Sequence, residues 1–205
     1  MLLKRMEVGS FAANCYLLAC DETKEGVVVD PGADAKRILK MVEDNQVNVK
    51  YIINTHGHVD HVGANEEVRE ALGAPILIHE ADGEMCKKPH ASLSTFLGKK
   101  TLAEPDRLIK GKDTFTVGNL TIEVIETPGH TKGCVTLLVD GKLFTGDTLF
   151  AGSIGRTDLP GGSFDEIIRS IKEKLLVFPD ETPVFPGHGP ESTIGDEKQY
   201  NPFLR

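Results

Sequence analysis

The chain lacks tryptophan, has only 6% aromatic residues, and contains no apolar run of membrane-spanning length. A transmembrane helix needs about 20 consecutive apolar residues, so we expect no membrane-embedded segment and no membrane partner. The first ten residues include Lys4, Arg5 and Glu7 and lack the apolar core of a signal peptide. The sequence therefore predicts a cytoplasmic protein.

Cysteine is also scarce, because the chain has only Cys15, Cys20, Cys86 and Cys134, with no CxxC spacing. This pattern argues against a disulfide framework and favours isolated thiols in a reducing compartment. We expect these four side chains to act as small buried hydrophobic groups rather than as metal ligands.

Positive charge is in deficit, with 23 Lys and Arg against 31 Asp and Glu and a formal net charge of −8. This balance argues against a nucleic acid as the main partner. The length of 205 residues and the 40% hydrophobic content fit one globular domain over residues 1–205. The oligomeric state stays open.

What the chain does contain is a dense group of metal-binding residue types, THGHVDH at residues 55–61. In extended backbone, residues two apart project to the same side, so His56 and His58 can converge on one metal ion. Asp60 and His61 can then turn toward another ion. The apolar run at 51–54 predicts a strand and residues 63–72 predict a helix, which places the motif on a loop at a strand end.

Further candidate ligands occur at the ends of other strand-like runs. His130 stands in TPGH after the run 120–125, Asp147 ends LFTGD, and His188 stands in PGH after residues 183–185. Imidazoles and carboxylates in this number suit zinc, iron or manganese. The recurrence argues against the alternative of an adventitious histidine-rich loop.

The chain resembles the metallo-β-lactamase superfamily over nearly its whole length. The HxHxDH motif, the later His, the Asp and the final His occur here in the order and at the spacing of that family. The resemblance implies an α/β fold, the αββα sandwich, with two mixed β-sheets face to face and helices outside. It implies two divalent metal ions, with zinc expected first and iron or manganese as alternatives. The ligands that it implies are His56, His58 and His130 for the first ion, Asp60, His61 and His188 for the second, and Asp147 as the bridge.

The pattern of apolar and turn residues predicts two strand-rich halves. Strands are expected at 2–8, 14–19, 26–30, 51–54 and 75–79, and then at 107–110, 114–117, 120–126, 134–140 and 142–145. Helices are expected at 34–43, 63–72 and 164–177. The alternation alone indicates only a layered α/β domain, and the sandwich is what the resemblance adds.

The segment DTLFAGSIGRTDLPGG, residues 147–162, resembles glyoxalase II, the hydroxyacylglutathione thioesterase. A basic residue after this glycine-rich turn contacts the glycine carboxylate of glutathione in that family, and Arg156 occupies the matching position. An arginine fork can give a carboxylate two parallel hydrogen bonds. An Arg156–Asp158 ion pair within the loop is the structural alternative. Only residues 189–205 follow His188, without the additional helical domain of two-domain glyoxalase II, so the thiol carrier stays open.

The resemblance implies hydrolysis of a small-molecule thioester, possibly glutathione-derived, by a hydroxide held between the metals and oriented by Asp60. No serine or cysteine nucleophile is required, and a thiolate leaves without strong acid assistance.

Several alternatives remain. Persulfide dioxygenases share the fold and use one iron on two His and one Asp, which would map to His56, His130 and Asp147. A lactonase or nuclease of the superfamily and a binding module without turnover are further hypotheses. The basic segment 87–104 is either a lid over the substrate or a solvated connection, and His79 and His90 are expected to be structural or solvent-facing.

Overall fold

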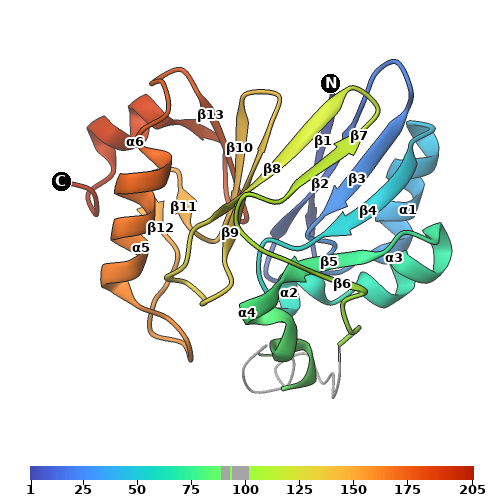
Figure 1. Cartoon of the computed structure of the whole chain (residues 1–205), viewed down its shortest axis with the longest axis horizontal. Coiled ribbons are helices and arrows are strands. Elements are labelled where there is room, and N and C mark those ends of the chain that lie inside the picture. The colour runs from blue at the N-terminus through green and yellow to red at the C-terminus, as the bar shows by residue number, and fades with distance from the viewer. Residues whose placement is uncertain (89–92, 94–101) are drawn as a thin grey trace.

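Two six-stranded sheets face each other in the structure, a computed structural model that describes residues 1–88, 93 and 102–205 (Figure 1). The first sheet contains, in spatial order, β1 (Leu2–Val8), β2 (Ala13–Ala19), β3 (Glu25–Val29), β4 (Asn48–Ile53), β5 (Ile76–His79) and β6 (Arg107–Ile109). Strands β1 to β3 are antiparallel and β3 to β6 are parallel. This sheet is therefore mixed, as predicted.

The second sheet has the order β14-β13-β10-β9-β8-β7. Its strands are β7 (Thr114–Val117), β8 (Leu120–Glu126), β9 (Val135–Val139), β10 (Lys142–Gly146), β13 (Pro183–Pro186) and β14 (Ser192–Thr193). Only β10 and β13 pair in parallel among its described strands, so this sheet is mixed too. A separate hairpin joins β11 (Leu149–Phe150) to β12 (Ser153–Ile154).

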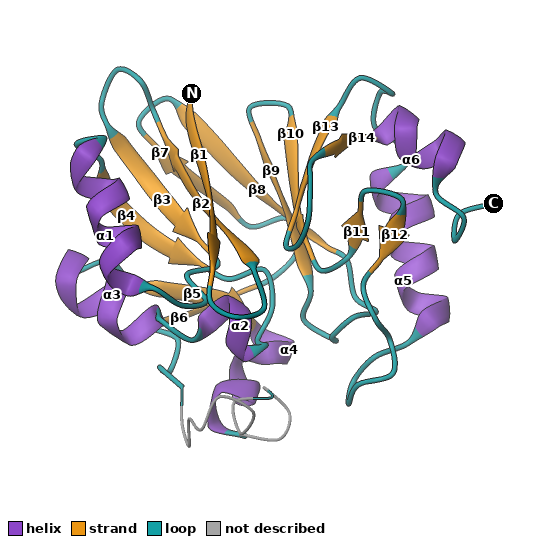
Figure 2. Ribbon diagram, turned by 180° about the vertical axis from the view of Figure 1, so that it is seen from behind, coloured by secondary structure: helices purple, strands orange, loops and turns teal. Residues whose placement is uncertain are grey.

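Helices cover the outer faces of both sheets (Figure 2). On the first sheet lie α1 (Ala35–Asp44) and α3 (Asn65–Leu72). On the second lie α5 (Phe164–Ser170), its π-helical continuation η3 (Ile171–Leu175) and α6 (Ile194–Tyr200). The short elements α2 (Val59–Val62), α4 (Glu80–Gly83) and the 3₁₀ turn η1 (Glu84–Lys87) lie along one end of the first sheet. The predicted αββα sandwich is confirmed.

Alternating side chains divide the core into layers, because successive residues of a strand point to opposite faces. Leu17 packs in the cluster that contains Ile38 of α1, whereas its neighbour Leu18 packs between the sheets. In the second sheet, Phe144 enters the layer between the sheets and Leu143 joins the cluster under α5. The two sheets therefore share a buried layer of side chains, which fixes the positions of their strand ends relative to one another.

Three details differ from the sequence predictions. The strand at 107–110 was expected in the second half, but β6 pairs in parallel with β5 in the first sheet. The metal motif is not wholly a loop, since residues 59–62 form helix α2. The short elements β11, β12, β14, α4 and α6 were not predicted, because they are too brief to show a hydrophobic period.

The described residues bear on the predictions about membrane segments and cysteines. Within these residues, no helix is long and apolar enough to cross a membrane. All four cysteine side chains are buried and free, as predicted. The lid hypothesis for residues 87–104 and the prediction for His90 fall largely on residues 89–92 and 94–101, which lie outside the described residues.

We predict that Phe144→Ala lowers the free energy of unfolding by about 3–5 kcal/mol, the usual cost of emptying a buried aromatic site. The Phe144 ring is 1% exposed and lies 5.2 Å from the Tyr16 ring and 5.1 Å from the Phe185 ring, measured between centroids. Phe164 on α5 is the matched control, because it is 51% exposed and its replacement should cost about 1 kcal/mol or less. Urea unfolding at fixed metal content measures both, and equal losses would contradict this account of the core.

Candidate metal centre

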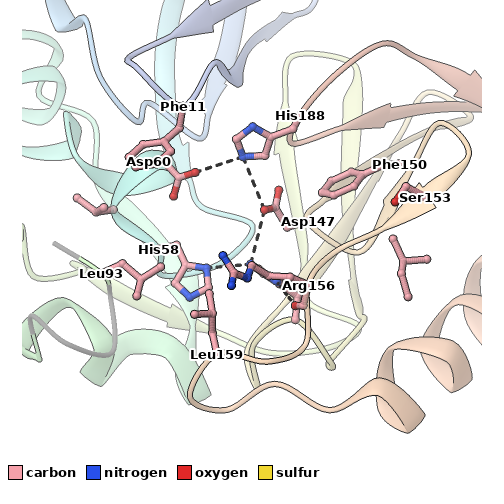
Figure 3. A pocket seen from close by; sticks show the side chains of 13 residues that line it. Phe11, His58, Asp60, Leu93, Asp147, Phe150, Ser153, Arg156, Leu159 and His188 are labelled. Atoms are coloured by element: carbon pink, nitrogen blue, oxygen red, sulfur yellow. Dashed lines mark hydrogen bonds and ion pairs between the residues drawn. The ribbon is translucent and has the colours of Figure 1, made fainter. Parts of the chain in front are cut away.

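The predicted metal ligands converge at one edge of the sandwich, although they come from four separate segments. The segments are the β4–α2 region, the β8–β9 loop, the end of β10 and the end of β13. Figure 3 shows Asp147 between His188 and the group around His58. The residues brought together are His56, His58, Asp60, His61, His130, Asp147 and His188.

The first group consists of His56, His58 and His130, whose candidate ligand atoms all lie within 4.8 Å of one another. His58 Nδ1 and His130 Nε2 are 2.8 Å apart. His56 Nε2 is buried without a hydrogen-bond partner. An unpaired buried polar atom is costly, and three convergent imidazole nitrogens are a typical zinc ligand set, so this group fits a metal ion.

The second group consists of Asp60, His61 and His188, again within 4.8 Å of one another. His188 Nε2 lies 3.2 Å from Asp60 Oδ2 and 3.2 Å from His61 Nε2. Asp147 stands between the two groups, with Oδ1 3.4 Å from His61 Nε2 and Oδ2 3.6 Å from His130 Nε2. Its two oxygens can therefore serve both groups.

Electrostatics differ between the groups. Burial holds the pKa of His56 well below its usual range and, together with neighbouring His130, lowers the pKa of His58 to about 3. Burial also opposes charge on His61, but the carboxylates of Asp147, Asp60 and Asp30 outweigh it and raise its pKa to about 10. His56 and His58 thus favour the neutral imidazole, the form that binds metals, whereas the carboxylates around His61 favour a positive charge in the second group.

Asp30 supports the centre from behind, and the sequence reasoning missed this role. Its carboxylate accepts hydrogen bonds from Thr55 N at 2.8 Å and Thr55 Oγ1 at 2.6 Å, and its Oδ2 lies 3.0 Å from His61 Nδ1. An imidazole anchored through one nitrogen presents the other to the metal. His130 is anchored likewise, since its Nδ1 donates to the Arg156 carbonyl at 2.7 Å. The only sequence signal for Asp30 was a carboxylate at a strand end.

The backbone beside the last histidine is closely packed against the centre. A Cβ atom at Gly187 would lie 2.2 Å from Asp147 Oδ1 and 2.8 Å from His61 Cε1. Only glycine therefore lets the β13 end approach the other segments closely enough to deliver His188.

A cavity of about 580 Å³ opens over the centre (Figure 3). Apart from the candidate metal ligands, most of the residues that line the cavity are apolar. They are Phe11, Val59, Leu93, Phe150, Ile154 and Leu159. Arg156 also lines it, and is the only lysine or arginine among the described residues that do. The Arg156 fork is paired with Asp158, with Nε–Oδ1 and Nη2–Oδ2 distances of 2.8 Å each. Arg156 thus faces the cavity and also makes the loop ion pair that sequence reasoning gave as the alternative.

Helix α6 and the residues after it hold one wall of this cavity in place. The sequence did not predict this role. Glu197 of α6 is 2% exposed and accepts hydrogen bonds from Gly152 N at 3.0 Å and Asn201 Nδ2 at 2.7 Å. Asn201 Nδ2 also donates to the Ser153 carbonyl at 2.9 Å. Helix α6 therefore anchors the β11–β12 hairpin, which carries Phe150 at the cavity.

His79 lies outside the cavity-lining set. Its Nδ1 accepts a hydrogen bond from Ala81 N at 3.2 Å, and its Nε2 lies 3.1 Å from Glu126 Oε1. The first contact caps α4 and the second joins the end of β5 to β8, in keeping with the structural role predicted for this histidine.

Comparison with known proteins finds a match to the family model of the metallo-beta-lactamase superfamily over residues 8–188. The probable metallo-hydrolase YqgX of Bacillus subtilis is 38% identical over 208 residues, covering 100% of this chain and 98% of that protein. The hydroxyacylglutathione hydrolase GloC of Haemophilus influenzae is 36% identical over 209 residues, with the same coverage of 100% and 98%.

Solved structures give the same picture. The BLEG-1 B3 metallo-beta-lactamase is 38% identical with a TM-score of 0.93, covering 99% of each chain. TTHA1623 in a di-iron-bound form is 33% identical with a TM-score of 0.86, covering 98% of this chain and 100% of that chain. ETHE1 from Myxococcus xanthus is 28% identical with a TM-score of 0.84, covering 98% and 84%.

We predict that the affinity for a divalent metal rises with pH between about 7 and 10. His61 carries a proton below its raised pKa of about 10, and the metal must displace that proton. One released proton makes the apparent affinity roughly tenfold weaker for each pH unit below that pKa. Titration of metal-free protein with chelator-buffered zinc measures this dependence. An affinity that stays flat from pH 7 to 9 would contradict the assigned charge of His61.

Proposed function

The chain belongs to the metallo-β-lactamase superfamily as a metallo-hydrolase, and we propose that it cleaves a small-molecule thioester. The observation that carries the proposal is the two-part ligand set under an apolar cavity with a guanidinium at its wall. Similarity to a relative named hydroxyacylglutathione hydrolase supports a thioester as the substrate class.

We assign the two ligand groups to two metal positions. His56, His58 and His130 would hold the first ion and Asp60, His61 and His188 the second, with Asp147 shared. The mixture of imidazole and carboxylate donors suits zinc. Iron is the specific alternative, because a relative of 33% identity has been solved in a di-iron-bound form, and manganese is a further one.

Two bound divalent cations would lower the pKa of a water molecule and polarise a carbonyl, which supplies a nucleophile and oxyanion stabilisation at neutral pH. Asp60 is the carboxylate that we assign to orient the nucleophile, because it lines the cavity and its Oδ2 lies 3.2 Å from His188 Nε2. A thiolate is a good leaving group, so the reaction needs no strong general acid.

The size and lining of the cavity indicate which chemical groups the substrate contains. Its volume of about 580 Å³ suits a small molecule, and its apolar wall would bury an aliphatic or aryl part. The Arg156 guanidinium, 61% exposed, would bind a carboxylate of the thiol carrier, which would replace Asp158 or use the free N–H groups of the fork. A glutathione-derived thioester offers such a carboxylate.

A second candidate function is persulfide oxidation. The similarity to ETHE1 from Myxococcus xanthus favours it, and the implied iron ligands His56, His130 and Asp147 lie together here. Oxygen consumption with glutathione persulfide would identify that activity, and release of free thiol from a thioester would identify the hydrolase. The same preparation should be assayed with lactones and β-lactams, because a solved relative is described as a β-lactamase.

We also propose that residues 1–205 form one cytoplasmic domain. The layer of side chains shared by both sheets supports a single domain. The four free cysteines suit a reducing compartment.

We predict that Asp147→Ala reduces thioester hydrolysis below a few per cent of wild type with zinc, iron or manganese. The substitution removes the carboxylate that lies within 3.7 Å of His61, His130 and His188 nitrogens. Steady-state assays at saturating metal measure the loss, with far-ultraviolet circular dichroism as the check on folding. Substantial turnover in a folded variant would show that Asp147 is not the shared ligand.

We predict that Arg156→Ala lowers kcat/KM for a glutathione thioester by roughly 10–150-fold, equivalent to about 1.5–3 kcal/mol for a charged hydrogen bond. A thioester of a small thiol without a carboxylate should be hydrolysed almost equally by variant and wild type, because the metal ligands are unchanged.

Asp158→Asn is the matched control for Arg156→Ala, since it removes the charge of the ion-pair partner and leaves the guanidinium in place. It should retain or improve activity on the glutathione thioester. Equal losses for both variants on both substrates, with lower melting temperatures, would show that Arg156 only braces its loop.

A further inference from the structure

We propose that Asp82 is a positioning residue for the first metal position, and that it acts by tying together the two loops that carry His58 and His130. This inference rests on the proposed function, because it takes His56, His58 and His130 as metal ligands. Asp82 itself lies on α4, directly after β5, and it is not among the residues that line the cavity.

The contacts of Asp82 are concentrated on the ligand loops. Its Oδ2 accepts hydrogen bonds from Gly57 N at 3.0 Å and from Thr131 Oγ1 at 2.6 Å. Its Oδ1 accepts a hydrogen bond from Gly133 N at 2.8 Å. Gly57 stands between His56 and His58 in the chain, and Thr131 follows His130. One carboxylate therefore joins the β4–α2 loop to the β8–β9 loop at the residues next to the ligands.

The β8–β9 loop packs closely against the Asp82 carboxylate. A Cβ atom at Gly133 would lie 2.6 Å from Asp82 Cγ, so only glycine allows this approach. The Asp82 residue is 1% exposed, and burial raises the pKa of its carboxyl even though three donors oppose that rise. Burying a charge is costly unless donors surround it. The three donors that satisfy Asp82 all come from the two ligand loops.

Asp82 and Asp30 support the centre in different ways. Asp30 contacts the second group directly through His61 Nδ1, and reaches the first group only through Thr55, whose Oγ1 lies 3.2 Å from His56 Nδ1. The hydrogen-bond donors to Asp82 are Gly57 and Thr131, which adjoin ligands of the first group, and Gly133, in the same loop as His130. Loss of Asp82 should therefore loosen the first position selectively, whereas loss of Asp30 should weaken the second.

The test compares wild type, Asp82→Asn and Asp30→Asn in crystals equilibrated with chelator-buffered zinc, where anomalous scattering gives the occupancy of each position separately. Asp82→Asn keeps the volume of the side chain but replaces an acceptor by an amide donor that faces other donors. We expect zinc affinity at the first position to fall roughly 10–100-fold, as for other groups that orient metal ligands, with the second position nearly unchanged. Asp30→Asn should weaken the second position.

Thr131 supplies a milder pair of variants in case Asp82→Asn does not fold. Thr131→Val removes the hydroxyl that donates to Asp82 and keeps the branched shape, whereas Thr131→Ser keeps the hydroxyl. We expect Thr131→Val to weaken the first position and Thr131→Ser to stay close to wild type. Equal behaviour of this pair would overturn the proposal for Asp82.

Two other outcomes are informative. If wild type binds zinc at both positions and Asp82→Asn weakens both equally or neither, the role of Asp82 is wrong while the proposed function stands. If wild type binds none of zinc, iron and manganese at either position, the proposed function fails and the inference about Asp82 fails with it.

Discussion

The crowding of imidazole nitrogens and carboxylate oxygens at one edge of the sandwich is the constraint on which the rest of this structure depends. Consecutive members of the series His58, His130, Asp147, His61, Asp60 and His188 lie 2.8–3.7 Å apart, and most of these side chains are buried. Buried nitrogens of His56 and His58 have no hydrogen-bond partner, and the nearby carboxylates outweigh burial and raise the pKa of His61 to about 10. Two metal ions would provide partners for the nitrogens and the carboxylates together, so the cluster is suited to a dinuclear metal site.

The sandwich makes this crowding possible because the shared layer between the sheets fixes the ends of β4, β10 and β13 relative to one another. Buried carboxylates then hold the connecting segments. Asp30 anchors His61, Asp82 joins two ligand loops, and Glu197 fastens the hairpin that forms part of the cavity wall. Each of these carboxylates is at most 2% exposed and is satisfied by several partners, so the same groups that stabilise the fold also determine the shape of the site.

The sequence predicted the layered fold and the seven candidate ligands because those signals are local or ordered along the chain. A continuous, mostly apolar run reveals β2 and alternation of apolar and polar residues reveals β8, and a histidine after such a run is visible in the sequence itself. The prediction that the strand at 107–110 belongs to the second half was wrong: β6 pairs with β5 in the first sheet, and pairing between strands far apart in the sequence has no local signal. Asp30, Asp82 and Glu197 were missed for a related reason: an aspartate or glutamate looks like a surface residue until the fold shows which donors surround it.

The central claim, a hydrolase with two metal ions on either side of Asp147, is tested most directly by following turnover of a thioester while metal is added back to metal-free protein. Elemental analysis of the same samples gives the metal-to-protein ratio. The account predicts that this ratio reaches two at saturation and that full activity requires the second ion. Full thioesterase activity at one ion per chain, with no further binding at high metal supply, would contradict the claim of two metal ions.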